Sequence, residues 1–344
     1  MRILLIRRGR FPPELYAGSE MNLHWLCRTL VANGHAVVVA ANTLGLAGTP
    51  PKLDYECGYP IYRAPNIMDA ASLAAAQFQS DVFIVPECGA WMAELPAIVR
   101  NGPIVIYEQD VSLGANGLPA DLKARALYVA NSLTTCANLS RECGVDSAIV
   151  PPLFGVDRYA GLRGGGSGVL FVSLQIRKGA DVAICIAQSR PKVPFLFVES
   201  WTRNAADTEA LRRFVGGVPN ITLLSNQPGL GHIMPKIKLL LMPSRSQEAW
   251  GRTATEAQIC GIPVLGTSRG NLPLTIGSGG MTLDPDEPIE RWLEAFDKIM
   301  DDPLVYEELS RHAFARGQAL TQEVYRAYQN FERVLFEAAA RRGA

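Results

Sequence analysis

Short apolar runs recur along almost the whole chain, and most are followed by a stretch whose apolar residues have helical spacing. Residues 2–6 form the first run. Ser19 is then expected to cap a helix whose apolar residues recur at spacings of three and four. Residues 35–41 are apolar at nearly every position, which is typical of strands buried on both faces of a parallel sheet. This alternation predicts a doubly wound α/β fold.

A glycine-rich stretch interrupts the alternation at residues 159–168, which read Tyr-Ala-Gly-Leu-Arg-Gly-Gly-Gly-Ser-Gly. Such a composition is typical of a flexible linker. We therefore expect an N-terminal Rossmann-like domain over residues 1–160 and a C-terminal one over 161–320. An amphipathic helix from residue 321 to the end at 344 should rejoin the first domain. The expected strands are 2–6, 35–41, 82–85, 104–107, 128–130, 148–150, 169–173, 195–199, 222–224, 239–242 and 264–266.

Composition argues against several classes of protein. The 344 residues carry 33 basic and 33 acidic side chains, a balance that disfavours a nucleic-acid-binding surface. No run approaches the ~18 apolar residues of a membrane span, and the first run is too short for a signal peptide. The seven cysteines are scattered without a CxxC pair, which is typical of reduced thiols. We expect a cytoplasmic protein without a membrane span; a peripheral membrane contact stays open.

The most informative motif lies between residues 243 and 267. An apolar run ends there in a polar loop that holds Glu248, and a helix carrying Glu256 follows. Eight positions along a helix span ~12 Å, close to the distance from the sugar to the ribose in a nucleotide diphosphate sugar. The free N–H groups of the intervening helix N-terminus suit a diphosphate. The motif reads Pro243-Ser244, Glu248, Trp250-Gly251, Glu256 and Gly261-Ile262-Pro263-Val264.

This motif resembles the signature of the family-four retaining glycosyltransferases (glycosyl transferases group 1), which have the GT-B fold of two facing Rossmann-like domains. Their pattern is Pro-Ser after a strand, a glutamate, an aromatic residue with glycine, a second glutamate, and Gly-x-Pro-Val. The resemblance extends more weakly over the rest of the chain. It includes Ala17-Gly18-Ser19-Glu20, Asn33-Gly34-His35-Ala36-Val37, Gly155-Val156-Asp157 and Arg177-Lys178-Gly179.

The resemblance implies an enzyme of the EC 2.4 class. It would move a sugar from a nucleotide diphosphate sugar to an acceptor hydroxyl with retention, without a metal or another cofactor. Glu248 would bind the sugar and Glu256 the ribose. Arg177 and Lys178 would neutralise the diphosphate as the leaving nucleotide gains charge. The other implied donor-binding residues are Gly18, Ser19, Ala249, Trp250, Gly251 and Thr253. The acceptor would be a glycan, a lipid-linked sugar or a small molecule.

The chain departs from the family pattern on the acceptor side. The family usually has histidines after the middle strands of its first domain, but residues 85–89 and 107–110 contain none. Glu108 or Asp110 is an alternative carboxylate near the acceptor hydroxyl. The missing histidines keep a second hypothesis open, an inactive or regulatory nucleotide-sugar-binding subunit. A GT-B epimerase or phosphorylase is less favoured, because the motif matches transferases better.

Three arginines, Arg7, Arg8 and Arg10, follow the first predicted strand. A solvated loop is the ordinary explanation for such a cluster. The alternative is a contact with an anionic acceptor.

Overall fold

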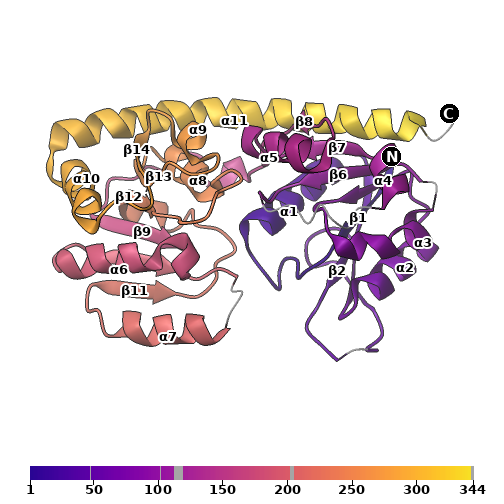
Figure 1. Ribbon diagram of the computed structural model, residues 1–344, viewed down its shortest axis with the longest axis horizontal. Coiled ribbons are helices and arrows are strands. Elements are labelled where there is room, and N and C mark those ends of the chain that lie inside the picture. The colour runs from indigo at the N-terminus through magenta and orange to yellow at the C-terminus, as the bar shows by residue number, and fades with distance from the viewer. Residues whose placement is uncertain (47, 101, 112–118, 202–204, 342–344) are drawn as a thin grey trace. The chain divides into compact units, whose positions relative to one another are not determined.

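The structure is a computed structural model that describes residues 1–46, 48–100, 102–111, 119–201 and 205–341. The chain divides into two compact units, Met1–Phe154 with Val324–Ala344, and Gly155–Glu323. Each unit has its own sheet with helices on both faces, which confirms the prediction of two Rossmann-like folds (Figure 1). Residues 342–344, at the end of the predicted C-terminal helix, lie outside the described residues.

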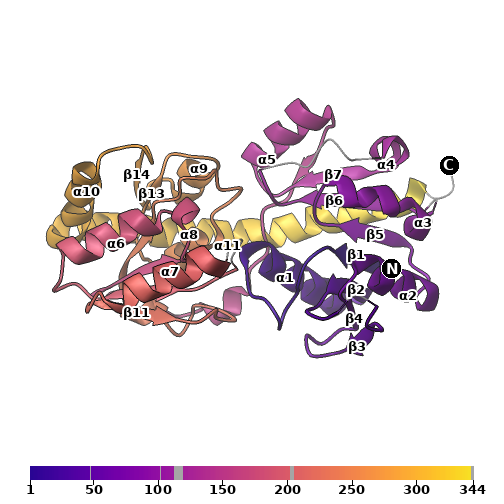
Figure 2. The ribbon, with the colours of Figure 1, turned by 60° about the horizontal axis from the view of Figure 1, so that its bottom comes forward.

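The first unit is built on an eight-stranded sheet, as far as the described residues show, in the order β3-β4-β2-β1-β5-β6-β7-β8. Its strand pairs are parallel except at the edge, where β3 is antiparallel to β4. The strands are β1 (Arg2–Arg7), β2 (Ala36–Asn42), β3 (Lys52–Asp54), β4 (Ile61–Ala64), β5 (Val82–Val85), β6 (Ile104–Glu108), β7 (Leu127–Ala130) and β8 (Ala148–Ile149). The helices are α1 (Gly18–Ala32), α2 (Ile67–Gln77), α3 (Pro96–Val99), α4 (Ala120–Arg125) and α5 (Leu133–Asn138) (Figure 2).

Alternate residues of β1 pack on opposite faces of this sheet. Ile3 and Leu5 share one core with α1 and with Phe331 of the long helix α11 (Pro303–Ala340). Leu4 and Ile6 share the other core with α2 and α3. Because both faces are covered, every one of these positions must be apolar, which accounts for the nearly continuous apolar runs in the sequence.

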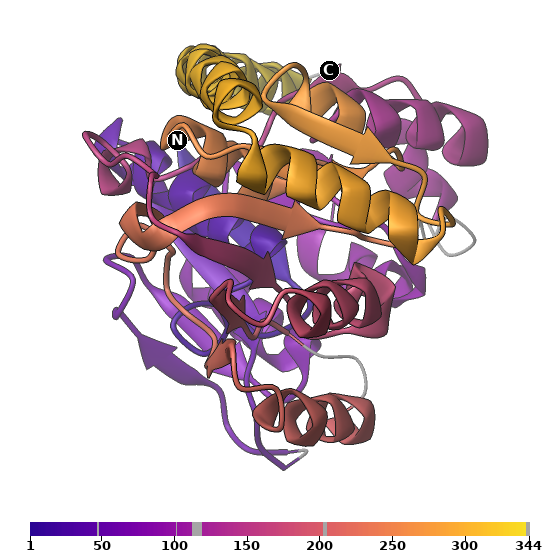
Figure 3. The same ribbon diagram turned by 90° about the vertical axis from the view of Figure 1, so that its left-hand side faces the viewer.

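The second unit is built on a parallel sheet that has six strands among the described residues, in the order β11-β10-β9-β12-β13-β14. Helices α6, α7 and α10 cover one face, which is turned toward the viewer in Figure 3, and α8 and α9 cover the other. The strands are β9 (Gly168–Val172), β10 (Phe195–Val198), β11 (Ile221–Leu224), β12 (Ile237–Met242), β13 (Val264–Thr267) and β14 (Gly280–Leu283). The helices are α6 (Ala180–Ser189), α7 (Ala205–Gly216), α8 (Arg252–Ile259), α9 (Leu272–Ile276) and α10 (Ile289–Asp301).

The prediction of a flexible glycine linker at residues 159–168 is wrong. The Gly164 N–H donates a hydrogen bond to the Cys260 carbonyl at 2.8 Å. A Cβ on Gly166 would lie 2.1 Å from the Lys236 carbonyl oxygen. These glycines lie within the second unit and allow close approach to the turn before β12, a packing role rather than a flexible one.

Helix boundaries also differ from the predictions. α1 begins at Gly18 with Ala17 at the N-cap, so Ser19 lies in its first turn and is not the cap. α11 begins at Pro303, well before the predicted start at residue 321. The helix contains Gly317 at a point of close packing, where a Cβ would lie 2.4 Å from the Gln258 carbonyl oxygen. Among the described helices, none combines the length and the apolar composition needed to cross a membrane.

Candidate functional site

The motif of the second unit lies where β12 ends and α8 begins. Gly251 makes the turn into α8 with φ +88°, and a Cβ on it would lie 2.4 Å from Leu272 Cδ2. Only glycine fits both the backbone angle and the space. The tight turn sets the first turn of α8 at the carboxyl end of the sheet, which is where doubly wound folds bind ligands.

Lys178 and Glu248, which are 70 residues apart in sequence, meet beside this turn. Lys178 Nζ lies 2.5 Å from Glu248 Oε1, and the two side chains are 19% and 12% exposed. The approach depends on Gly179, where φ is +79° and a Cβ would lie 2.0 Å from the Pro243 carbonyl oxygen. The structure thus brings together two of the predicted catalytic residues.

Arg177 lies on the same short 3-10 turn as Lys178, Ile176–Lys178. Its guanidinium carbon lies 5.3 Å from the centre of the Trp201 ring, and its carbonyl accepts a hydrogen bond from the Arg245 N–H at 3.0 Å. No carboxylate of the described residues forms an ion pair with Arg177. Its charge is therefore available to an anionic ligand.

Glu256 lies inside α8 and is 6% exposed. Its Oε1 accepts a hydrogen bond from Arg252 Nε at 2.8 Å, one helical turn earlier. Burial, together with the charge of Glu256, raises the pKa of the Tyr159 hydroxyl well above its ordinary value. Glu256 is therefore a fixed carboxylate in a polar cluster inside the second unit.

The remaining predicted residues of the loop have mixed surroundings. Trp250 is 8% exposed; its indole N–H donates to Thr255 Oγ1 at 3.0 Å, and its carbonyl accepts from Thr275 Oγ1 at 2.6 Å. Ala249 and Thr253 are half-buried. The Trp250 side chain therefore stabilises the loop. Ala249 and Thr253 are more accessible to a ligand than Trp250 is.

Gly270, which holds the Glu248 backbone, was not among the predicted site residues. The two residues form a parallel bridge, and the Asn271 N–H donates to the Glu248 carbonyl at 2.8 Å. Gly270 has φ +63°, and a Cβ on it would lie 2.4 Å from the Glu248 carbonyl oxygen. A glycine shortly after the strand at residues 264–267 was the available signal.

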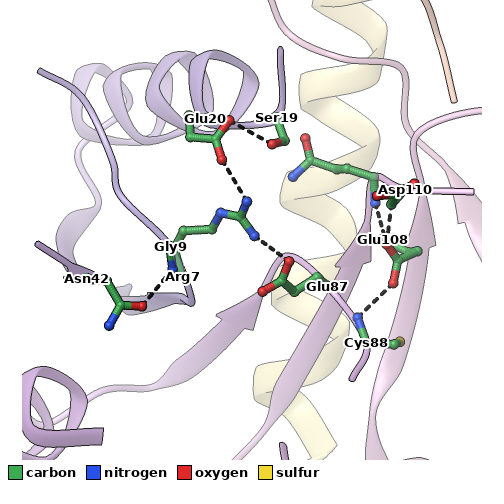
Figure 4. A network of polar contacts seen from close by, with 10 residues as sticks. Arg7, Gly9, Ser19, Glu20, Asn42, Glu87, Cys88, Glu108 and Asp110 are labelled. Atoms are coloured by element: carbon green, nitrogen blue, oxygen red, sulfur yellow. Dashed lines mark hydrogen bonds and ion pairs between the residues drawn. The ribbon is translucent and has the colours of Figure 1, made fainter. Parts of the chain in front are cut away.

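In the first unit, Gly18 and Ser19 form the start of α1, beside a charged cluster (Figure 4). Arg7 donates to Glu20 at 2.6 Å and to Glu87 at 2.5 Å, and Ser19 Oγ donates to Glu20 at 2.9 Å. Burial lowers the pKa of Arg7, but the two carboxylates outweigh it, so the pKa is raised above its ordinary value. An added Cβ on Gly18 would have no described atom within 4 Å, apart from those of its chain neighbours and of its own helix backbone.

Glu108 and Asp110, the alternative acceptor-side carboxylates, differ sharply. Glu108 is 1% exposed, and its two oxygens accept hydrogen bonds from the backbone N–H groups of Cys88, Gln109 and Asp110 at 2.7–3.0 Å (Figure 4). Burial raises its pKa to about 7, although those hydrogen bonds oppose the shift. Asp110 is exposed. Glu108 therefore holds together the segments that follow β5 and β6, and of these two carboxylates only Asp110 is exposed to solvent.

Comparison with known proteins locates a family within the second unit. Residues 170–316 match the family described as glycosyl transferases group 1. D-inositol 3-phosphate glycosyltransferase of Pseudarthrobacter chlorophenolicus is 29% identical over 206 residues, which are 54% of this chain and 49% of that protein. The Paenarthrobacter aurescens protein of the same name is 28% identical over 207 residues. The chain spans about half the length of these curated relatives.

Solved structures match over nearly the full length. Sucrose-phosphate synthase from Thermosynechococcus elongatus has a TM-score of 0.79 at 16% identity, covering 98% of this chain and 99% of that one. HepE of Anabaena, solved with UDP and glucose, has a TM-score of 0.77 at 17% identity, covering 97% and 98%. These likenesses confirm the predicted fold. The chain has the GT-B fold, and residues 170–316, most of its second unit, match the glycosyl transferases group 1 family.

Proposed function

We propose that this protein is a retaining glycosyltransferase that moves a sugar from a nucleotide diphosphate sugar to an acceptor hydroxyl. Its relatives are named D-inositol 3-phosphate glycosyltransferases, and HepE was solved with UDP-glucose. Uridine diphosphate is therefore the first nucleotide to test. The proposal includes a cytoplasmic location, which fits the unpaired state of all seven cysteines.

The observation that carries the proposal is the contact between Lys178 and Glu248. In a nucleotide sugar, the bond to be broken joins the sugar to a phosphate. A carboxylate suits the sugar hydroxyls and an ammonium group suits the phosphate. Under this proposal, the bond between sugar and phosphate would lie beside this contact. Lys178 and Arg177 would stabilise the charge that grows on the leaving phosphate.

We assign Glu256 to the ribose, at the other end of the donor. Its carboxylate is already held by Arg252, so it can accept the ribose hydroxyls without first being ordered. Metal independence is also part of the proposal, because Arg177 and Lys178 would supply the positive charge that a divalent ion supplies in other enzymes. In that case turnover should survive an excess of EDTA. Loss of turnover in EDTA, restored by a divalent ion, would remove this part.

The test compares Glu256→Ala with Glu248→Ala by calorimetry with the bare nucleotide and by turnover of the nucleotide sugar. Contacts with the ribose exist before and during reaction, so Glu256→Ala should weaken nucleotide binding roughly ten- to a hundredfold. Glu248→Ala should leave that affinity nearly unchanged and should lower turnover, as contacts strengthened in the transition state do. Glu294→Ala, which removes an exposed carboxylate paired with Arg291, is the control and should change neither.

Four outcomes would count against the proposal or a part of it. Equal loss of nucleotide affinity in both variants would contradict the separate roles of the two glutamates. No loss in either would remove the donor site from this motif. Nucleotide-sugar binding without turnover, against any acceptor or water, would favour the inactive binding subunit. An inverted linkage in the product, read by NMR, would overturn retention alone.

A further inference from the structure

A second polar site lies within the first unit, in an open depression of about 540 Å³. It is lined by Arg8, Gly9, Arg10, Asn42, Thr43, Leu44 and Glu87. These residues lie at or just after the carboxyl ends of β1, β2 and β5, and β1 lies between the other two strands in the sheet. The depression is therefore at the carboxyl edge of the first sheet, the ligand-binding edge of such folds. Its volume suits a molecule of the size of a monosaccharide.

Two of the lining cations have no partner among the described residues. Arg8 is exposed and Arg10 half-buried, and neither forms a hydrogen bond or ion pair with the residues that the structure describes. By contrast, Arg7 and Arg63 of the same unit are each paired with carboxylates. The guanidinium groups of Arg8 and Arg10 are thus free to bind a planar or tetrahedral oxyanion through paired N–H groups.

The loop that carries these arginines is held in place. The Gly9 N–H donates to Asn42 Oδ1 at 2.7 Å, and the Asn42 N–H donates back to the Gly9 carbonyl at 3.0 Å. Asn42 Nδ2 also donates to the Pro65 carbonyl at 2.8 Å. Gly9 has φ +126°, which other residues rarely adopt. Because the loop is fixed, little backbone ordering remains to oppose ligand binding.

Glu87 gives the depression a hydrogen-bond acceptor. One of its oxygens, Oε2, accepts from Arg7 Nη1 at 2.5 Å, and the side chain is 29% exposed. Its other oxygen accepts no hydrogen bond from the described residues. That oxygen can accept a ligand hydroxyl while Arg7 balances the carboxylate charge.

We propose that this depression binds the acceptor and that the acceptor is a polyhydroxylated molecule bearing an oxyanion, either a phosphate or a carboxylate. Arg8 and Arg10 pair with the oxyanion, and Glu87 accepts a hydrogen bond from a hydroxyl group. The inference rests on the proposed function, because it names the acceptor class of that transfer.

The experiment is calorimetry on the full chain with glucose 6-phosphate, glucuronate and glucose, in the presence of saturating nucleotide so that the second unit is occupied. At least one anionic sugar should bind more tightly than glucose, and its affinity should fall as salt is raised. The double variant Arg8→Ala/Arg10→Ala should weaken this binding roughly tenfold or more, without changing nucleotide affinity. Lys52→Ala/Lys123→Ala removes two exposed positive charges elsewhere on the same unit and should have no effect.

Preference for glucose 6-phosphate identifies a phosphate acceptor, and preference for glucuronate a carboxylate one; either supports the proposal. Anionic sugars that bind no tighter than glucose, or bind the double variant as tightly as the wild type, would overturn it. Loss of nucleotide affinity in the double variant would also overturn it, by assigning the arginines to the donor. Failure of the proposed function would appear in the nucleotide binding and turnover of the Glu256 and Glu248 variants. Failure of this inference would appear in the binding of the anionic sugars, so the two are distinguishable.

Discussion

Glu108 is a buried carboxylate at the end of β6 that holds the segment after β5, and its pKa is raised by burial. Its pKa is about 7 in the fold, against 4.5 for the group in water. The folded state therefore holds more protons than the unfolded state between these values, so this residue makes the fold less stable as pH rises from about 4.5 to 7. The full effect is at most about 3 kcal/mol, since one pKa unit is ~1.4 kcal/mol.

We expect the unfolding free energy of the wild type, relative to that of Glu108→Gln, to fall by most of this amount between pH 5 and pH 8. Hydrogen exchange of the β5 and β6 amides, corrected for the intrinsic pH dependence of exchange, reports the first unit separately. Asp110→Asn, at the exposed neighbour, should keep the wild-type dependence. A difference that grows with pH would mean that the backbone hydrogen bonds dominate over burial at Glu108.

At the scale of single loops, close approach of two segments sets the position of Glu248. Gly270 and Gly144 have nearly the same φ, +63° and +62°, but only at Gly270 would a Cβ meet other atoms, those of the Glu248 backbone. We expect Gly144→Ala to cost ~1–2 kcal/mol of stability through the left-handed backbone alone, without loss of turnover. Gly270→Ala should cost more and also lower donor turnover, because Glu248 must move.

Thermal unfolding and initial rates measure the two effects of this glycine pair. The proposed role of Gly270 in positioning Glu248 would be wrong if Gly270→Ala lowered the melting temperature no more than Gly144→Ala does and kept full turnover. Nucleotide affinity should change little in either variant, since Glu256 lies deeper in α8.

The same elements show what could be predicted from the sequence. Strands such as β1 and β9 were predictable because both faces are buried, which demands apolar residues throughout. The edge strand Lys52–Asp54 was not, because it is short and mostly exposed and carries no apolar pattern. The composition of the glycine-rich stretch is typical of a flexible linker, but its glycines allow close packing instead. That packing depends on residues distant in the sequence.

Of the candidate site, the residue types were predictable and most of the partnerships were not. The spacing of Glu248 and Glu256 was visible in the sequence. The contact of Glu248 with Lys178, 70 residues away, depends on two loops meeting at Gly179. The pairing of Arg7 with both Glu20 and Glu87 likewise joins three distant segments. Such partnerships follow from the sheet order, which no local pattern contains.

For the molecule as a whole, the C-terminal helix α11 carries part of the core of the first unit. Phe331 is fully buried there, with its ring centre 5.2 Å from that of Tyr107, while Phe336 on the same helix is 55% exposed. We expect Phe331→Ala to cost ~3–5 kcal/mol and Phe336→Ala less than ~1 kcal/mol.

Hydrogen exchange can locate the loss. Protection should fall in β1 and β6 of the first unit in Phe331→Ala and remain in β9 and β12 of the second, since the cavity opens in the core of the first unit only. Equal loss in both sheets would mean that the two units unfold as one cooperative structure.

The position of α11 also has a consequence for synthesis on the ribosome. Residues 1–154 emerge first, yet their core includes Ala327, Phe331 and Leu335, which emerge after the whole of the second unit. Domains usually fold in the order of their synthesis, N-terminal first. Here the second unit can complete its folding while the apolar core of the first unit is still exposed. The half of the protein that is translated first is thus the last that can mature, and during that interval it is the part that chaperones would bind.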